Sequence, residues 1–297
     1  MPQFPNILLH AIPGFILLIA VEVIYAIKLQ KELYEVKDAA TSISLGLGNL
    51  VIGIITKSFV LLFFTALYEH RFFTIPYASW WAWVLCFLCD DVSYYWMHSV
   101  SHKVRWFWAS HVVHHSSERY NLAAALRQTW TGNLTGSFLF WFWMPLVGFH
   151  PGMILFMQSV SLLYQFWIHT ETIGKMPPWF EFIFNTPSHH RVHHGSDLVY
   201  LDKNNGGTLI IWDRIFLSFQ SEEFTPTYGL TKNVKTFNPV KIAFFEWINI
   251  GKDLKKARTI KHAFHSLFDS PGWSGDGTSL TTKQLRKKQD PTRQWEN

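Results

Sequence analysis

The stretch FPNILLHAIPGFILLIAVEVIYAI, residues 4–27, is apolar along nearly its whole length. A helix needs about 20 such residues to cross a bilayer. Because the stretch lacks a basic n-region and a small-residue cleavage site, we expect it to remain as a membrane anchor rather than to be removed as a signal peptide. The whole chain, with 17% aromatic and only 16% charged residues, does not suit a soluble surface. We therefore predict an integral membrane protein.

Four further apolar segments follow, at residues 42–67, 79–97, 134–147 and 153–168. The last two are separated only by GFHPG, a short uncharged turn that predicts a helical hairpin dipping into or across the membrane. The sequence thus predicts an all-α membrane bundle with about four to five membrane segments. Lys57 lies near the middle of the second segment, where a charge is costly. It either faces a polar interior or reaches the interface by snorkelling.

The distribution of basic residues predicts the orientation, because Lys and Arg are retained on the cytoplasmic side. Of the 26 basic residues, 17 follow residue 168, whereas the loop near Arg71 and the turn at 148–152 hold one between them. This places the N-terminus outside, and it places two histidine-rich stretches, 97–129 and 169–219, in a cytoplasmic cap. The net charge of +5 fits anionic lipid headgroups better than nucleic acid.

Three regions are expected from this pattern: membrane segments at 1–89, a histidine-rich domain at 90–219, and an interfacial helix with a tail at 220–297. The interfacial helix is VKIAFFEWINIGKDLKKART, residues 240–259, for which a solvated amphipathic helix is the alternative. We expect the tail from residue 270 onward, rich in Gly, Ser and Lys, to be a loop. Cys86 and Cys89 are interpreted as small buried side chains rather than as a redox pair.

Histidines occur in three strings, HSVSH at 98–102, HVVHH at 111–115 and SHHRVHH at 188–194. On a helix, residues three and four apart share one face, so each string directs its imidazoles towards one point. This spacing favours metal binding over isolated core histidines. Eight histidines exceed the four ligands of one zinc ion, which implies two metals. Imidazole suits Zn, Cu, Fe and Ni, so the spacing does not name the metal.

Ligating imidazoles usually donate their outer N–H to a carboxylate or a carbonyl. The candidates for this supporting role are Asp91, Glu118, Asp202, Asn204 and Asp213. Asp91 precedes His98 by seven residues, which returns it to the same helical face. His189 has no counterpart in the string at 111–115, so we expect it beside the site rather than on the metal.

In order and spacing, these motifs resemble those of the fatty acid hydroxylase and sterol desaturase superfamily of membrane di-iron enzymes, over about residues 90–219. The surrounding strings, DVSYYWMHSVSH at 91–102 and WASHVVHHSSERYNLAAALRQT at 108–129, are most similar to its alkylglycerol monooxygenase branch. The resemblance implies two irons, O2 as cosubstrate, and hydroxylation or desaturation of an unactivated C–H bond in a lipid or sterol-like chain. The implied ligands are His98, His102, His111, His114, His115, His190, His193 and His194, with His169 and His189 as further candidates.

One departure concerns the source of electrons. Lys103 stands where animal members of that branch have an acidic residue, which argues against dependence on tetrahydropterin. Since no fused cytochrome or flavin motif is visible, we expect a separate electron donor. Two alternatives stay open: O-alkyl cleavage of an ether lipid through an unstable hemiacetal, and a zinc-dependent membrane hydrolase or metal-transport protein. The sequence names neither the lipid, the carbon attacked nor the oligomeric state.

Overall fold

The computed structural model describes residues 4–5 and 7–289, and within these ranges the regular structure is helical. Apart from the helices there are two isolated β-bridges, Phe184 with Leu209 and Gly195 with Tyr228. The predicted all-α class is confirmed for this part of the chain. The long helices are α1 (Ile7–Lys28), α2 (Val36–Glu69), α3 (Trp80–Lys103), α6 (Pro151–Trp167) and α10 (Pro239–Lys256).

Two of these helices, α1 and α2, are long and apolar enough to cross a membrane. Only 6% of the apolar window of α1 and 17% of that of α2 is buried, so neither is the core helix of a soluble protein. Ile16 of α1 and Ile54 of α2, for example, are 64% and 71% exposed. Helices that present so much apolar surface need an apolar surrounding. The protein is therefore a membrane protein.

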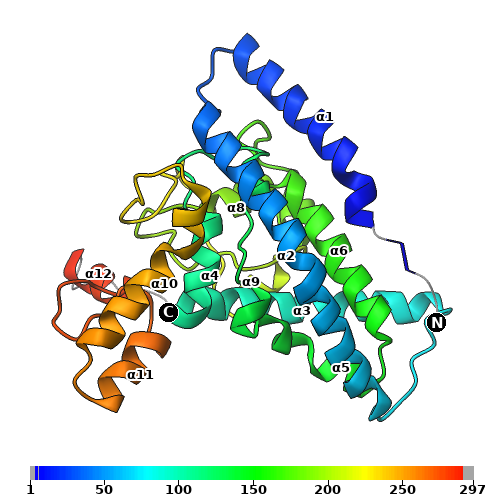
Figure 1. Cartoon of the computed structure of the whole chain (residues 1–297). Coiled ribbons are helices and arrows are strands. Elements are labelled where there is room, and N and C mark those ends of the chain that lie inside the picture. Colours follow the sequence, from blue (N-terminus) through cyan, green and yellow to red (C-terminus); the bar gives the residue numbers. More distant parts are fainter. Residues whose placement is uncertain (1–3, 6, 290–297) are drawn as a thin grey trace.

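Helix α6 contacts α1, α2 and α3, and Figure 1 shows α2 and α6 running side by side while α3 crosses behind their lower halves. Phe64 of α2, Cys86 of α3 and Met153 of α6 are fully buried where these helices meet. Because lipid tails are as apolar as these side chains, the contact stabilises the bundle through close packing rather than through the hydrophobic effect.

The apolar segment at 134–147 is not the single helix that we expected. It forms two 3-10 turns and one short helix: η2 (Asn133–Thr135), η3 (Ser137–Trp141) and α5 (Trp143–Val147). Gly136, between the two turns, has φ +85°, a left-handed conformation that interrupts helical geometry and that glycine adopts without steric cost. Hydrophobicity alone did not reveal this break.

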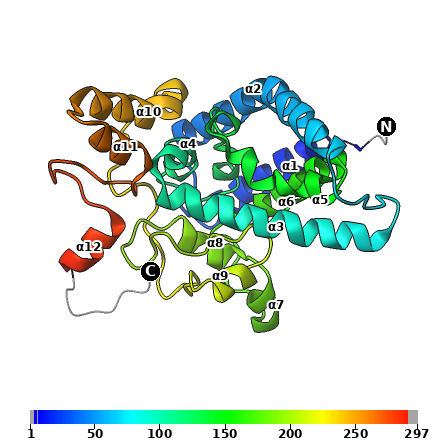
Figure 2. The ribbon, with the colours of Figure 1, turned by 90° about the horizontal axis from the view of Figure 1, so that it is seen from below.

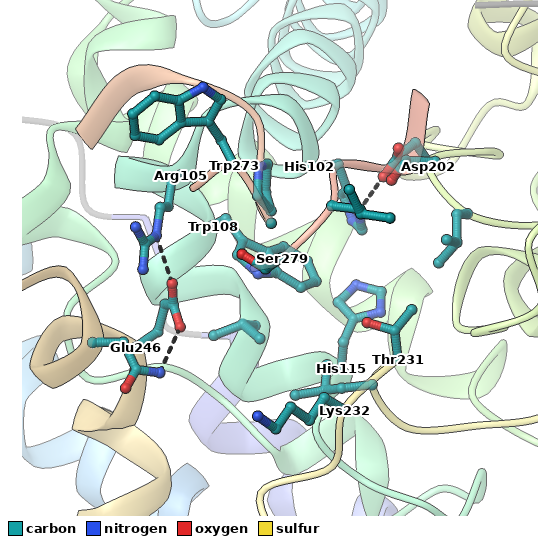
Figure 3. A pocket seen from close by; sticks show the side chains of 18 of the residues that line it. His102, Arg105, Trp108, His115, Asp202, Thr231, Lys232, Glu246, Trp273 and Ser279 are labelled. Carbon is teal, nitrogen blue, oxygen red and sulfur yellow. Dashed lines mark hydrogen bonds and ion pairs between the residues drawn. The ribbon is translucent and has the colours of Figure 1, made fainter. Parts of the chain in front are cut away.

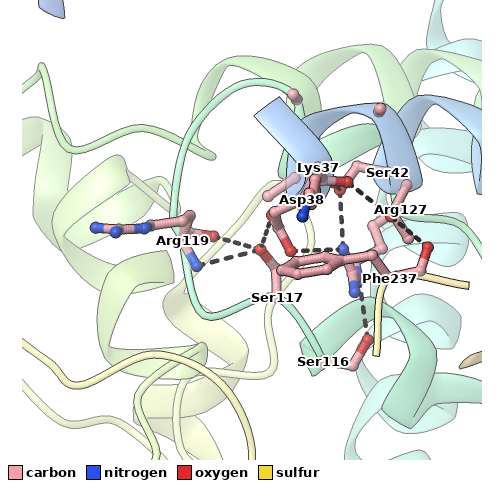
Figure 4. A network of polar contacts seen from close by, with 12 residues as sticks. Lys37, Asp38, Ser42, Ser116, Ser117, Arg119, Arg127 and Phe237 are labelled. Atoms are coloured by element: carbon pink, nitrogen blue, oxygen red, sulfur yellow. Dashed lines mark hydrogen bonds and ion pairs between the residues drawn. The ribbon is translucent and has the colours of Figure 1, made fainter. Parts of the chain in front are cut away.

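The histidine-rich part consists of short elements gathered around the end of α3 (Figure 2). These elements are α4 (Arg105–His115), η1 (Ala124–Leu126), α7 (Pro178–Ile183), α8 (Pro187–His193) and α9 (Ile211–Ile215). A buried ion pair ties them to the start of α2, with an Arg127 Nη1 to Asp38 Oδ1 distance of 3.0 Å (Figure 4). Arg127 also donates to Ser42 and to Ser116. The start of α2, the end of α4 and the loop after η1 thus share one polar contact network.

The last part of the described chain contains α10, α11 (Ile260–Phe268) and α12 (Thr282–Gln289). The predicted helix at 240–259 is confirmed as α10, which Arg105 fastens to α4 through Glu246 at 2.8 Å and Asp253 at 2.7 Å. The prediction that the tail is a loop is wrong at residues 282–289, which form the helix α12. Arg286 of α12 donates to the carbonyl of Leu201 at 2.7 Å, a long-range contact that the local composition does not reveal. Residues 290–297 of that tail lie outside the described residues.

Candidate metal centre

Nine histidines converge into two adjacent clusters. Within each cluster the candidate ligand atoms all lie within 4.8 Å of one another. The first cluster, cluster A, contains His98, His102, His111, His115 and His193; the second, cluster B, contains His114, His169, His190 and His194. The structure therefore brings together all eight histidines that the resemblance implied as ligands, together with His169, one of the two further candidates.

The strings at 111–115 and 190–194 divide reciprocally between the clusters. On α4, His111 and His115 belong to cluster A and His114 to cluster B. At α8 the assignment is inverted, because His190 and His194 belong to cluster B and His193 to cluster A. In each string the positions i and i+4 serve one cluster, while i+3 serves the other. Each string therefore contributes histidines to both clusters.

A second pair of elements completes the two clusters. Helix α3 contributes His98 and His102, four residues apart, to cluster A, whereas the end of α6 contributes His169 to cluster B. Gln165 lies four residues before His169, the same spacing that separates His98 from His102 in cluster A. Its side chain accepts a hydrogen bond from Tyr94 at 2.7 Å and donates one to Ser161 at 3.0 Å. Cluster B consequently has four imidazoles where cluster A has five.

Backbone carbonyls orient several of the imidazoles through their outer nitrogens. The Nδ1 atoms of His98, His169 and His193 lie 2.8, 2.6 and 2.9 Å from the carbonyl oxygens of Asn205, Gln165 and Lys203. A carbonyl oxygen only accepts, so the proton is on Nδ1 and the lone pair is on Nε2. The inward nitrogens are thereby held in the form that binds a metal.

The inward nitrogens lie at the spacing that ligands of one metal ion have. Nε2 of His111 lies 2.9 Å from Nε2 of His98 and 3.0 Å from that of His115, and the His190 and His169 Nε2 atoms are 3.0 Å apart. Two nitrogens bound about 2.1 Å from one ion at right angles would be about 3 Å apart. Other Nε2 atoms are buried without a hydrogen-bond partner; these belong to His102, His193 and His194. This donor set fits metal ions.

Burial sets the protonation state of the histidines. It lowers the pKa of His114 to about 4, against weaker opposing contributions such as the Arg127 carbonyl. The pKa values of His111 and His193 fall well below the usual range, first because of burial and then because of neighbouring imidazoles. A metal ligand must be a neutral imidazole, so the site keeps these groups ready for binding at neutral pH.

Asp91 and Asp213 support the site through the backbone rather than through a histidine ring. Asp91 accepts from the N–H groups of Thr208 at 2.8 Å and Leu209 at 3.1 Å. Asp213 accepts from the N–H of Asn205 at 2.7 Å. Both carboxylates therefore shape the loop at 204–209, and that loop presents the carbonyl that orients His98.

The other three supporting candidates lie in different surroundings. Asp202 lies 3.7 Å from Nδ1 of His102, as expected for a carboxylate beside a ligand. Asn204 donates to the carbonyl of His189 at 3.0 Å and so links its loop to α8. Glu118 is exposed on the loop after α4, and its carboxylate is not among the groups that orient the imidazoles.

His189 belongs to neither cluster. Its Nε2 lies 4.0 Å from a carboxylate oxygen of Glu181, and burial lowers its pKa to about 4. This matches the expected position beside the site. Sequence reasoning missed the backbone carbonyls of Lys203, Asn205 and Arg127 as partners of the imidazoles, because every residue carries a carbonyl and no side-chain pattern marks the ones used.

Two cavities reach the clusters. A predominantly apolar cavity of about 430 Å³ is lined by α1, α2, α3 and α6, and it ends on His111, His114 and His169. A more polar cavity of about 650 Å³ lies beside cluster A, where His102 and His115 form part of its wall (Figure 3). The centre therefore has one access lined by the membrane helices and another between α4, α10 and the C-terminal segment.

A helical membrane protein with two clusters of neutral imidazoles is, by fold and site, of the class that builds metal centres from histidines alone. Residues 83–218, a little under half of the chain, match the family model of fatty acid hydroxylases. The resemblance expected from the histidine motifs is confirmed.

The chain is also similar to alkylglycerol monooxygenases of animals. It is 40% identical to that of Homo sapiens over 91% of this chain and 61% of the relative. For Danio rerio the values are 37%, 92% and 61%, and for Caenorhabditis elegans they are 35%, 71% and 42%. The chain spans about three fifths of the length of the first two relatives. No solved structure matches it significantly.

Proposed function

We propose that the protein is a membrane-bound non-haem di-iron oxygenase that hydroxylates an unactivated C–H bond of a lipid chain with O2 and external electrons. The observation that carries this proposal is the apolar cavity, which leads from α1 and α2 to His111, His114 and His169. An alkyl chain that enters from the bilayer would end beside both clusters. The match to the fatty acid hydroxylase family supports the same reaction class.

Nine histidines would hold the metals, and their number supports two ions, because structural sites take four ligands. Bound there, a pair of irons would supply the reductive activation of dioxygen that unactivated C–H bonds require. The contribution of the chain itself is positional. Carbonyls hold the rings of His98, His169 and His193 with Nε2 inward, and the apolar wall excludes water from the bound alkyl chain.

The polar cavity is the proposed approach for a separate electron donor. It touches cluster A at His102 and His115, and Lys232 and Lys252 line it. Because the lipid would occupy the apolar cavity, a water-soluble donor would need this second access. The position of Lys103 in α3 continues to argue against tetrahydropterin in this role.

The membrane arrangement is part of the proposal. We infer a multi-pass protein with about four to five membrane segments, of which α1 and α2 meet the length criterion and the others would be shorter or partly inserted. The excess of basic residues after α6 supports a cytoplasmic location for the histidine-rich cap. We keep the division at 1–89, 90–219 and 220–297 as part of the proposal, and the match over residues 83–218 supports its middle region.

Ether-lipid cleavage is the second candidate, favoured by the relatives named alkylglycerol monooxygenase. Hydroxylation of the carbon beside an ether oxygen gives a hemiacetal, which releases an aldehyde without further catalysis. Desaturation would instead remove two hydrogens from the chain. A metal transporter has less support, because the histidines gather at one site instead of being spread along α1 and α2. A zinc hydrolase is the other alternative, and iron rather than zinc in the purified protein would exclude it.

Purified protein in lipid nanodiscs tests the proposal. We expect about two irons per chain and O2-dependent gain of one oxygen in a lipid, with aldehyde release if the substrate is an ether. His193→Ala should lose both properties, whereas His70→Ala, at the far end of α2, should keep them. Zinc in place of iron, or products that form equally without O2, would refute the oxygenase.

A further inference from the structure

The charged side chain that lines the apolar cavity is Lys57. Among the described residues around this cavity, Lys57 is the one Lys, Arg, Asp or Glu, and the rest of the wall is mainly apolar. It lies near the middle of α2, 12 residues before the helix ends at Glu69. A cationic side chain at such a position in a membrane helix usually serves a pathway or a ligand.

The direction of the Lys57 side chain argues against snorkelling to the nearer helix end. A Cβ placed on Gly53 would lie 3.7 Å from Cε and 3.9 Å from Cδ of Lys57. The stem therefore runs back along α2, beside Gly53. It points towards the histidine end of the cavity and away from Glu69.

Within residues 4–5 and 7–289, Lys57 forms no ion pair. Its side chain is exposed at the surface of α2 and borders the apolar cavity, whose described wall offers it no carboxylate. An ammonium carries three donors and no acceptor. Leaving it unpaired in an apolar setting is costly, so the missing partner must be an acceptor, and an anionic one compensates best.

The cavity supplies the place for this partner. Gly46, which also lines the cavity, lies 11 residues before Lys57, or roughly 16 Å at 1.5 Å per residue. The histidine end of the cavity lies beyond Gly46, where His111 and His114 are found. A molecule with an acceptor at one end and an alkyl chain of about that length would reach from the ammonium to the metal clusters.

We propose that Lys57 binds the anionic group of a single-chain lipid, a carboxylate or a phosphate monoester, and so sets which carbon reaches the histidine clusters. The choice of the carbon that reaches the histidine clusters rests on the proposed function, whereas the binding of the anionic group by Lys57 does not. Lys57 is in this view a specificity-determining residue.

Binding is measured first, on protein without reductant, so that activity does not enter. The probes are palmitic acid, hexadecyl phosphate and hexadecanol, titrated into nanodisc-held protein by native mass spectrometry. Lys57→Met removes the charge and keeps the length, Lys57→Arg keeps the charge, and Lys241→Met on α10 is the matched control. A charge-assisted hydrogen bond predicts a roughly tenfold to hundredfold loss of anion binding in Lys57→Met.

We expect the wild type to bind one or both anions more tightly than hexadecanol. Lys57→Met should lose this preference while it binds hexadecanol unchanged, and Lys57→Arg and Lys241→Met should keep it. Loss with the acid alone or with the phosphate alone would identify the anionic group. If Lys57→Met binds both the acid and the phosphate as well, relative to the alcohol, as the wild type does, the inference is overturned. Oxygenase assays on the neutral alcohol are separate: their failure in every form of the protein would refute the proposed function and leave the binding result standing.

Discussion

Removing one partner of the buried Arg127–Asp38 pair should destabilise the protein strongly. Arg127 is 2% and Asp38 is 7% exposed at the side chain, and their contact at 3.0 Å is the centre of the network in Figure 4. Asp38 also accepts from Ser117 at 2.6 Å. In Arg127→Met or Asp38→Asn, a charge stays buried without its partner, which costs about 3–5 kcal/mol.

The double variant Asp38→Asn/Arg127→Met should recover part of this loss, because no unpaired charge is then left buried. For a chain of this size each kcal/mol corresponds to roughly 2–4 °C in Tm, so the single variants should melt about 6–20 °C lower. Thermal unfolding in nanodiscs, followed by circular dichroism, measures the three shifts. Single variants within about 2 °C of wild type, or a double variant that falls by the sum of both, would refute the reasoning.

Three further predictions concern the metal centre. His193→Ala should lose bound iron while His189→Ala keeps it, since His189 lies outside both clusters; metal analysis of the purified variants decides this. Acid should destabilise the metal-free protein: the pKa of His114 is about 4 when folded and about 6.5 when unfolded. The unfolded state therefore binds more protons in that window, and stability present above about pH 6.5 should fall towards pH 4 in thermal melts, whereas melts that do not change would contradict it. Asp91→Asn should weaken iron affinity about 10–100-fold, because it loosens the loop that orients His98. Competition with a chelator measures this affinity, and an unchanged value would contradict the prediction.

Much of the site follows from helical periodicity. The spacing in HVVHH and in HHRVHH is enough to predict that these imidazoles meet, since positions three and four apart share a face. It does not predict that His114 and His193 cross to the other cluster, because that depends on how α4 and α8 face each other. The carbonyl partners of His98 and His169 are equally hidden, since only the folded backbone selects them.

The membrane part follows from hydrophobicity only where the helix is uninterrupted. Segment 42–67 became part of the long helix α2, as its composition suggests. Segment 134–147 is also apolar, yet Gly136 adopts a left-handed conformation and separates its first residues from the short helical stretch Ser137–Val147. In the tail, the contacts of Arg286 hold α12 in place, and tertiary contacts of this kind override a local preference for loops.

The reciprocal division of the strings at 111–115 and 190–194 also orders events during biosynthesis. Neither cluster has its full set of imidazoles until the ribosome has completed residue 194, long after α1 and α2 have left the exit tunnel. The apolar helices would thus be inserted in the bilayer before either ion has a finished site. If the proposed irons are bound, loading with metal would then be a late step, after the insertion of α1 and α2.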